Sequence, residues 1–352
     1  MRSNGSHLLR GIAAPERASR LSAVDGSIAP VFLGFLVLLL AAAGVSTAAA
    51  QGFKPTRPIE FLVHTGPGGG NDLLARAISG IVEKEKLLPV RMQVANKTGG
   101  GGITAMSYLS EKKGETHTIA LFANTWINGP LMSKEARVTM KDLTPIARLV
   151  TEPGVIVVKS DSQYKSLKDF IEDAKKQPGQ LKQSGGSIGS RDNIVRQLLM
   201  KNTGAQWAYI SFPGGGERRA ALLGGHVQMM VMDPQEAGEH LRNGTLRILA
   251  QIAEKRMAAM PDVPTVPEAG FNIPNYLVIR GVVGPPDMPV EVVKFWEAFF
   301  ARLAKTAAWK KYLEENLFED GFQTTAELVK FLDTFTDQAR AVLTDAGVKV
   351  HR

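Results

Sequence analysis

The stretch Phe61–Arg76, FLVHTGPGGGNDLLAR, joins an apolar run to a helical pattern through a loop that holds four glycines. Residues 59–63, IEFLV, predict a buried strand. Apolar residues at 73, 74, 77, 78, 81 and 82 form one stripe of a helix predicted over 72–85. A strand followed at once by a helix leaves backbone N–H groups unpaired at the helix start, where they attract anions.

Strand-like and helical runs alternate along the chain from residue 58 onward. Further strands are predicted at 90–96, 118–124, 154–160, 226–233 and 245–253, and further helices at 103–109, 166–177, 192–204, from 217, and at 234–242. Ser166 and Asp169 are spaced as a capping box for one of these helices. The alternation predicts an α/β fold with largely parallel sheets covered by helices.

The composition shifts after Ala253 to a proline-rich stretch, and helical patterns follow it. We therefore predict two α/β lobes. Lobe I is expected to comprise residues 51–149 and 254–352, and lobe II residues 150–253.

The composition excludes several kinds of chemistry. The 352 residues include no cysteine, so disulfides and thiolate chemistry are absent. The net charge of +8 is scattered, without a Lys/Arg run interleaved with aromatics, so nucleic acid is not an expected partner. The six histidines lack metal-ligand spacing, and neither a metal nor a cofactor is expected.

The first 50 residues are typical of a signal peptide. Four arginines precede the apolar run 31–44, and small residues follow it, with Ala48 and Ala50 placed for cleavage after residue 50. An uncleaved membrane anchor is the alternative, although the apolar run is short for a span. The predicted location is the periplasm.

Three loops rich in glycine and hydroxyls, at 65–71, 184–190 and 213–216, each precede a predicted helix. Phosphate is not the expected ligand, because a P-loop needs Gly-Lys where this chain has Asn71 and Asp72. Asp72 is expected to point away and cap the helix. The loops either bind another anion or permit tight turns.

Residues 185–189 match the nucleophile elbow G-x-S-x-G, which would make Ser187 the nucleophile of a serine hydrolase. Asp233 and His240 follow in the right order for a triad. However, residues 179–184 are polar and predict no buried strand before the motif. The hydrolase is therefore a minor alternative, and no catalytic residue is predicted.

Several motifs resemble those of Bug-type receptors, the periplasmic substrate-binding subunits of tripartite tricarboxylate transporters. They are RPIEFLVHTGPGGGNDLLAR, VANKTGGGGIT, DLTPIARLVTEPGVIVVK, FPGGGERRAALLGGHVQ, GTLRILAQIAEKRMAAMPDVPTVPEAGF and GPPDMPVEVV, and they run from about residue 57 to residue 348. The resemblance implies a type II periplasmic-binding fold, with two α/β lobes joined by two crossover strands and a cleft that closes on a ligand.

The resemblance also implies a function and a site. Such receptors perform no chemistry, generally act as monomers, and deliver di- or tricarboxylic, aromatic or amino acids to membrane permease subunits. A sensing receptor for a membrane signalling protein is the alternative. The implied ligand-binding positions are Thr65, Gly66, Pro67, Gly68, Gly69, Asn124 and Thr125 in lobe I and Ser187, Gly189, Ser190, Pro213, Gly214 and Asp233 in lobe II.

The chain departs from the family pattern at the expected cleft. His64 and Thr65 replace a proline and an aromatic residue, and Asn193, preceded by Arg191 and Asp192, stands near a usual histidine. Arg280 lies where a tryptophan is often found. Arg280 either makes a bidentate contact to a ligand carboxylate or forms an ion pair within the protein.

Overall fold

The computed structural model of this chain describes residues 52–351, so the predicted signal peptide lies outside the described residues. A first sheet has six strands in the order β11-β4-β10-β3-β1-β2. Its strands are β1 (Ile59–Val63), β2 (Met92–Asn96), β3 (Thr118–Ala123), β4 (Thr144–Glu152), β10 (Val278–Gly284) and β11 (Glu319–Gln323). We call this sheet and its helices lobe I.

Strands β1, β2 and β3 are parallel, as the alternation predicts. Phe61 lies opposite Val94 of β2 on one side and opposite Ile119 of β3 on the other. Strand β10 is antiparallel to both β3 and β4, because the chain enters it from the other lobe.

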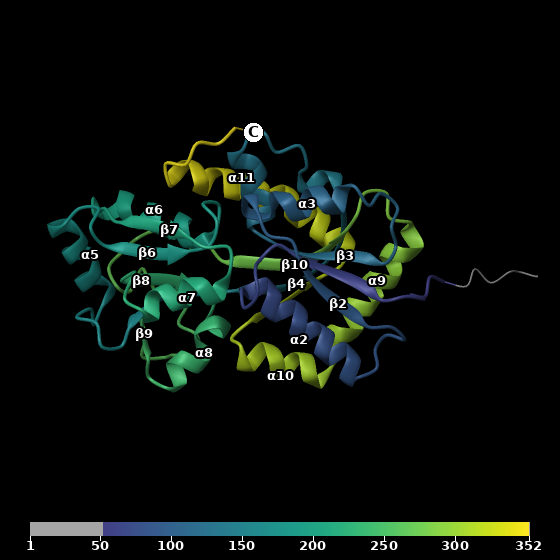
Figure 1. The fold of residues 1–352 in the computed structure, drawn as a ribbon, viewed down its shortest axis with the longest axis horizontal. Helices are drawn as coiled ribbons and strands as arrows, with labels where there is room; N and C mark the ends of the chain where they lie inside the picture. The colour runs from purple at the N-terminus through teal and green to yellow at the C-terminus, as the bar shows by residue number, and fades with distance from the viewer. Residues whose placement is uncertain (1–51, 352) are drawn as a thin grey trace, which may run out of the picture. The chain divides into compact units, whose positions relative to one another are not determined.

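Helices cover both faces of this sheet (Figure 1). The side chain of Phe61 packs with α2 (Gly70–Lys84), α9 (Val290–Lys305) and α10 (Ala307–Glu315). Its neighbour Leu62 points to the opposite face, with α3 (Ile103–Ser110), α4 (Thr125–Met132) and α11 (Thr325–Asp345). Successive side chains of a strand face opposite ways, so an unbroken apolar strand predicts a sheet buried on both faces.

The second sheet has five strands in the order β7-β6-β8-β5-β9. They are β5 (Gly154–Lys159), β6 (Lys182–Gly185), β7 (Ala208–Ser211), β8 (Met229–Met232) and β9 (Leu246–Ile252). Val155 and Val157 pack with α7 (Gly215–Leu223) and α8 (Pro234–Arg242), while Ile156 and Val158 pack with α5 (Leu167–Lys176) and α6 (Arg191–Thr203). We call this sheet and its helices lobe II.

The chain passes between the sheets twice, from β4 to β5 and from β9 to β10. Two α/β lobes joined in this way form a type II periplasmic-binding fold, which confirms the predicted fold class. Strand β4 continues to Glu152, past residue 149, because it pairs with β10 up to Val278. The lobe boundaries themselves stay a prediction. No helix within residues 52–351 is long and apolar enough to span a membrane.

Two local predictions meet different outcomes. Ser166 accepts a hydrogen bond from the Asp169 N–H, and the Asp169 side chain accepts one in return, which confirms the capping box. In contrast, the prediction that no buried strand precedes Ser187 is wrong, since β6 lies there. Gln183 and Ser184 of this strand are buried because each has a partner: Trp207 donates to Gln183 Oε1 at 2.9 Å, and Ser184 donates to the Arg218 carbonyl at 3.1 Å.

Candidate functional site

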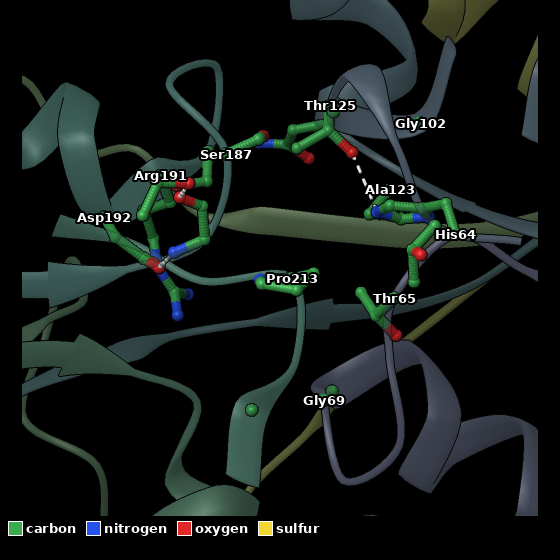
Figure 2. Close-up of a pocket in the computed structure, with 18 of the residues that line it drawn as sticks. His64, Thr65, Gly69, Gly102, Ala123, Thr125, Ser187, Arg191, Asp192 and Pro213 are labelled. Atoms are coloured by element: carbon green, nitrogen blue, oxygen red, sulfur yellow. Dashed lines mark hydrogen bonds between the residues drawn. The ribbon is translucent and has the colours of Figure 1, made fainter. Parts of the chain in front are cut away.

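A cavity of about 270 Å³ lies between the lobes and is lined by residues of both. Figure 2 shows His64 and Thr65 on one side of it, Arg191 and Asp192 on the other, and Pro213 between them. The lining comprises His64, Thr65, Gly69, Gly70, Thr98, Gly99, Gly100, Gly101, Gly102, Ala123, Asn124, Thr125, Gly186, Ser187, Ser190, Arg191, Asp192, Ser211, Phe212, Pro213, Gly215, Arg218, Asp233, Val278 and Arg280.

Five α-helices begin at this cavity. The N-cap or first residue of each lines it, namely Gly69 for α2, Asn124 for α4, Ser190 for α6, Gly215 for α7 and Asp233 for α8. Helix starts carry unpaired N–H groups and the positive end of the helix dipole. The cavity therefore offers backbone donors to an anion from both lobes.

The structure brings together nine of the fourteen predicted site residues. Those that line the cavity are Thr65, Gly69, Asn124, Thr125, Ser187, Ser190, Pro213, Asp233 and Arg280. The three glycine loops predicted from separate parts of the sequence thus converge on one cavity.

The other five, Gly66, Pro67, Gly68, Gly189 and Gly214, lie outside the lining. Three of them form contacts between the lobes. The Gly66 N–H donates to the Pro213 carbonyl at 3.0 Å, the Gly68 carbonyl accepts from Arg219, and the Gly189 carbonyl accepts from Asn128. These glycines support the walls of the cavity rather than facing it.

The Gly99–Gly102 loop is part of the site, although none of its residues is among the predicted site residues. All four residues have positive φ, between +55° and +131°, and all line the cavity. A Cβ on Gly102 would lie 2.9 Å from the Trp126 ring, and one on Gly101 would lie 3.0 Å from Ser187 Oγ. The run of four glycines was the available signal, because side chains are strained at such φ values.

His64 is half-buried, and its hydrogen bonds fix its tautomer. Trp126 Nε1, which can only donate, lies 2.9 Å from His64 Nδ1, so Nδ1 is the acceptor. Burial and the charge of Arg280 lower the pKa of His64 to about 3, so the ring is neutral at pH 7. Its proton is therefore assigned to Nε2, which donates to Thr125 Oγ1 at 2.9 Å (Figure 2).

The Thr125 hydroxyl is consequently positioned as a donor. Its oxygen accepts from His64, so its own hydrogen is left for another acceptor. Thr125 is the first residue of α4 and lines the cavity. An acceptor oxygen of a ligand would satisfy it.

A buried ionic cluster forms the side of the cavity where the two sheets meet. Arg280, on β10, donates from Nε to Glu152 at 2.7 Å and also contacts Asp233 and Asn71. Arg191 donates to Asp233 as well. Arg280 thus forms the ion pairs that were one of its two predicted roles, and contact with a ligand carboxylate stays a prediction.

The pKa values reflect this pairing. Burial raises the pKa of Glu152 to about 8 despite the attraction of Arg280. Burial acts in the same direction on Asp233, but Arg280 and Arg191 outweigh it and lower the pKa of that carboxyl. Burial also raises the pKa of Glu236, which pairs with Arg218 at 2.7 Å. Every arginine in this lining is bound to an acid.

Gly70 lets the lobes meet at this cluster. A Cβ at residue 70 would collide with the Asp233 carboxylate and the Arg280 guanidinium. Gln235 of lobe II also donates to the Gly70 carbonyl at 3.4 Å. Glycine is required at residue 70 because Asp233 and Arg280 approach its backbone closely, and not because of its φ angle.

Asp72 does not line the cavity, as expected, but the expectation that it caps the helix is wrong, because the N-cap of α2 is Gly69 and no side chain caps it. The Asp72 carboxylate accepts from the Gly68 N–H at 2.9 Å and from Arg76 and Asn96. These bonds hold the first loop against α2.

The serine hydrolase triad does not form. His240 Nδ1 bonds to Thr245 at 3.2 Å, and Asp233 is bound to arginines. Within residues 52–351, Ser187 Oγ makes no hydrogen bond to a histidine, and no cluster of possible metal ligands is found.

Comparison with known proteins identifies the family. The model of the tripartite tricarboxylate transporter family receptor matches residues 75–348. The chain belongs to this family. Its members are solute-binding receptors rather than enzymes, which removes the hydrolase alternative and confirms the resemblance seen in the sequence motifs.

Individual relatives agree with this assignment. Protein BugT of Bordetella pertussis is 28% identical over 242 residues, which are 68% of this chain and 74% of BugT. An R. palustris protein solved with adipate has a TM-score of 0.79 at 22% identity, covering 84% of this chain and 98% of that one. MatC from Rhodopseudomonas palustris, solved with bound malate, has a TM-score of 0.74 at 22% identity, covering 82% and 99%.

Proposed function

We propose that this protein is a periplasmic solute receptor that binds a small carboxylate in the cavity between its lobes. Binding closes the lobes about β4 and β10, and the closed form delivers the ligand to the membrane subunits of a tripartite tricarboxylate transporter. The predicted signal peptide would export the chain to that compartment.

The convergence of five helix starts on one cavity is the observation that carries this proposal. Backbone N–H groups and hydroxyls bind a carboxylate without any unpaired cation. The arginines of this cavity are bound to acids, so neutral donors are the groups left for the ligand. The adipate and malate seen in the two structural relatives are of the same chemical class.

The decisive experiment is a calorimetric titration of the purified protein with a panel of aliphatic, aromatic and amino carboxylic acids. Gly69→Val is the cleft variant, because its Cβ would lie 3.0 Å from Thr65 Cβ and its side chain would occupy the cavity wall. We expect the best ligand to bind it at least about tenfold more weakly, about 1.4 kcal/mol.

Gly52→Val is the matched control, since nothing lies within 4 Å of a Cβ at that exposed position. Its affinity should equal that of the wild type. If no carboxylate binds the wild type, or if Gly69→Val binds as tightly as Gly52→Val, this cavity is not a carboxylate site.

A sensing role is the alternative function. The two are separated by deleting the gene and measuring uptake of the labelled ligand. Loss of uptake supports transport, whereas unchanged uptake with loss of ligand-dependent gene expression supports sensing.

A further inference from the structure

Asp192 places a carboxylate in a cavity that is otherwise arranged for an anion. It lies in the first turn of α6, is buried, and lines the cavity in Figure 2. Its Oδ2 accepts from the Gly186 N–H and from Arg218, both at 2.9 Å. Its Oδ1 accepts no hydrogen bond from any residue in the range 52–351. Asp192 Oδ1 is not among the buried atoms that lack a partner, so it is accessible from the cavity and can accept a hydrogen bond from a ligand group.

The charges around the cavity leave no cation for a second ligand carboxylate. Arg191 pairs with Asp233, Arg218 with Asp192 and Glu236, and Arg280 with Glu152 and Asp233. Arg218, the arginine that pairs with Asp192, is shared with Glu236 and is therefore already occupied. A second carboxylate placed beside Asp192 would meet repulsion without compensation.

The wall of the cavity opposite Asp192 offers hydrogen-bond donors instead of acceptors. The Thr125 hydroxyl is a donor, the Gly99–Gly102 loop lines the same wall, and Figure 2 shows Thr125 and His64 across the cavity from Asp192. A ligand that fits both walls has an acceptor at the lobe I end and a donor at the lobe II end.

We propose that Asp192 determines specificity by accepting a hydrogen bond from a hydroxyl or ammonium group on the ligand, so that the receptor selects carboxylates that also carry such a donor. This inference rests on the proposed function, because it assumes that the ligand carboxylate lies in this cavity. It narrows the ligand class from carboxylates in general to hydroxy acids and amino acids.

The test compares matched acids that differ only at the donor. The sets are propionate, lactate and alanine; succinate, malate and aspartate; and glutarate, hydroxyglutarate and glutamate. Each is titrated into the wild type by calorimetry. In the set that binds best, we expect the hydroxy or amino acid to bind at least about tenfold tighter than the plain acid. Preference for the hydroxy or the amino member identifies the donor.

Asp192→Asn tests the residue itself. The amide can still accept from Gly186 and Arg218 but presents an N–H₂ group to the cavity, so the preference should fall to about one or reverse. Asp161→Asn is the control, because Asp161 is exposed and pairs with Lys159 away from the cavity. It should keep the wild-type ratio.

Two results would overturn the inference: a plain acid that binds the wild type as tightly as its matched hydroxy and amino acids, or an Asp192→Asn variant that keeps the wild-type ratio. If Asp192→Asn does not fold, the wild-type ratio alone decides. Failure of every carboxylate to bind would instead defeat the proposed function.

Discussion

Replacing His64 with glutamine should remove a large part of the acid sensitivity of folding. The folded state holds His64 neutral, with a pKa of about 3, whereas an unfolded histidine titrates near 6.5. Between these values the unfolded chain binds the additional proton, so the free energy of unfolding falls as the pH is lowered from 6.5 towards 3.

The size of the effect follows from the two pKa values. At pH 4.5 the unfolded histidine is 2 pH units below its pKa, while the folded ring remains neutral. At about 1.4 kcal/mol per unit, His64 accounts for about 3 kcal/mol of stability lost between pH 7.5 and pH 4.5. Glutamine does not titrate, and its amide can donate to Thr125 in place of Nε2.

Urea unfolding at pH 7.5 and pH 4.5 measures this directly. The loss between the two conditions should be about 3 kcal/mol smaller in His64→Gln than in the wild type. His226→Gln is the control, because His226 is exposed and should leave the loss unchanged. If His64→Gln loses as much stability as the wild type, the histidine is not held neutral by its surroundings and the assigned tautomer is wrong.

Two further substitutions test the packing around the cavity. Arg280→Met leaves two buried carboxylates without their shared partner and should lower the free energy of unfolding in urea by about 3–5 kcal/mol. The control Arg57→Met removes only an exposed ion pair and should lower it by about 1 kcal/mol or less. Equal losses in the two variants would contradict the buried cluster. Gly102→Ala should lower the melting temperature, because Gly102 has a φ of +107° and its Cβ would lie against Trp126. Gly80→Ala should raise the melting temperature, because Gly80 lies in α2 with open space around it and alanine stabilises a helix by up to about 1 kcal/mol. A shift of the same sign in both variants would refute the described loop geometry.

Much of the fold was predictable because its signals are local. Helix α8 begins at Pro234 and ends at Arg242, as predicted, and Gly204 ends α6 in the left-handed conformation that the sequence indicated. Strand β6 was not predicted, because the polar residues of this segment were expected to be exposed to solvent. Gln183 and Ser184 are buried through bonds to residues distant in the sequence, and no local pattern reveals such partners.

The site was predictable in part for the same reason. Glycine loops at helix starts are recognisable from the sequence, and they contain five of the nine predicted residues that line the cavity. The roles of charged residues did not follow from the sequence. Whether Arg280 faces a ligand or an acid depends on Glu152 and Asp233, which come from different strands and lobes. Likewise, the tautomer of His64 depends on an indole 62 residues away.

The missing side chain at Gly70 has a consequence for engineering. Because a single methyl group at residue 70 would collide with Arg280 of its own lobe and with Asp233 of the other lobe, alanine there would prevent the two lobes from closing. Such a variant could still fold and keep its ligand-binding loops, yet it would be unable to close its lobes when a ligand binds. Paired with the wild type in a fluorescent reporter, it would supply a non-responding reference that differs by one carbon and two hydrogens.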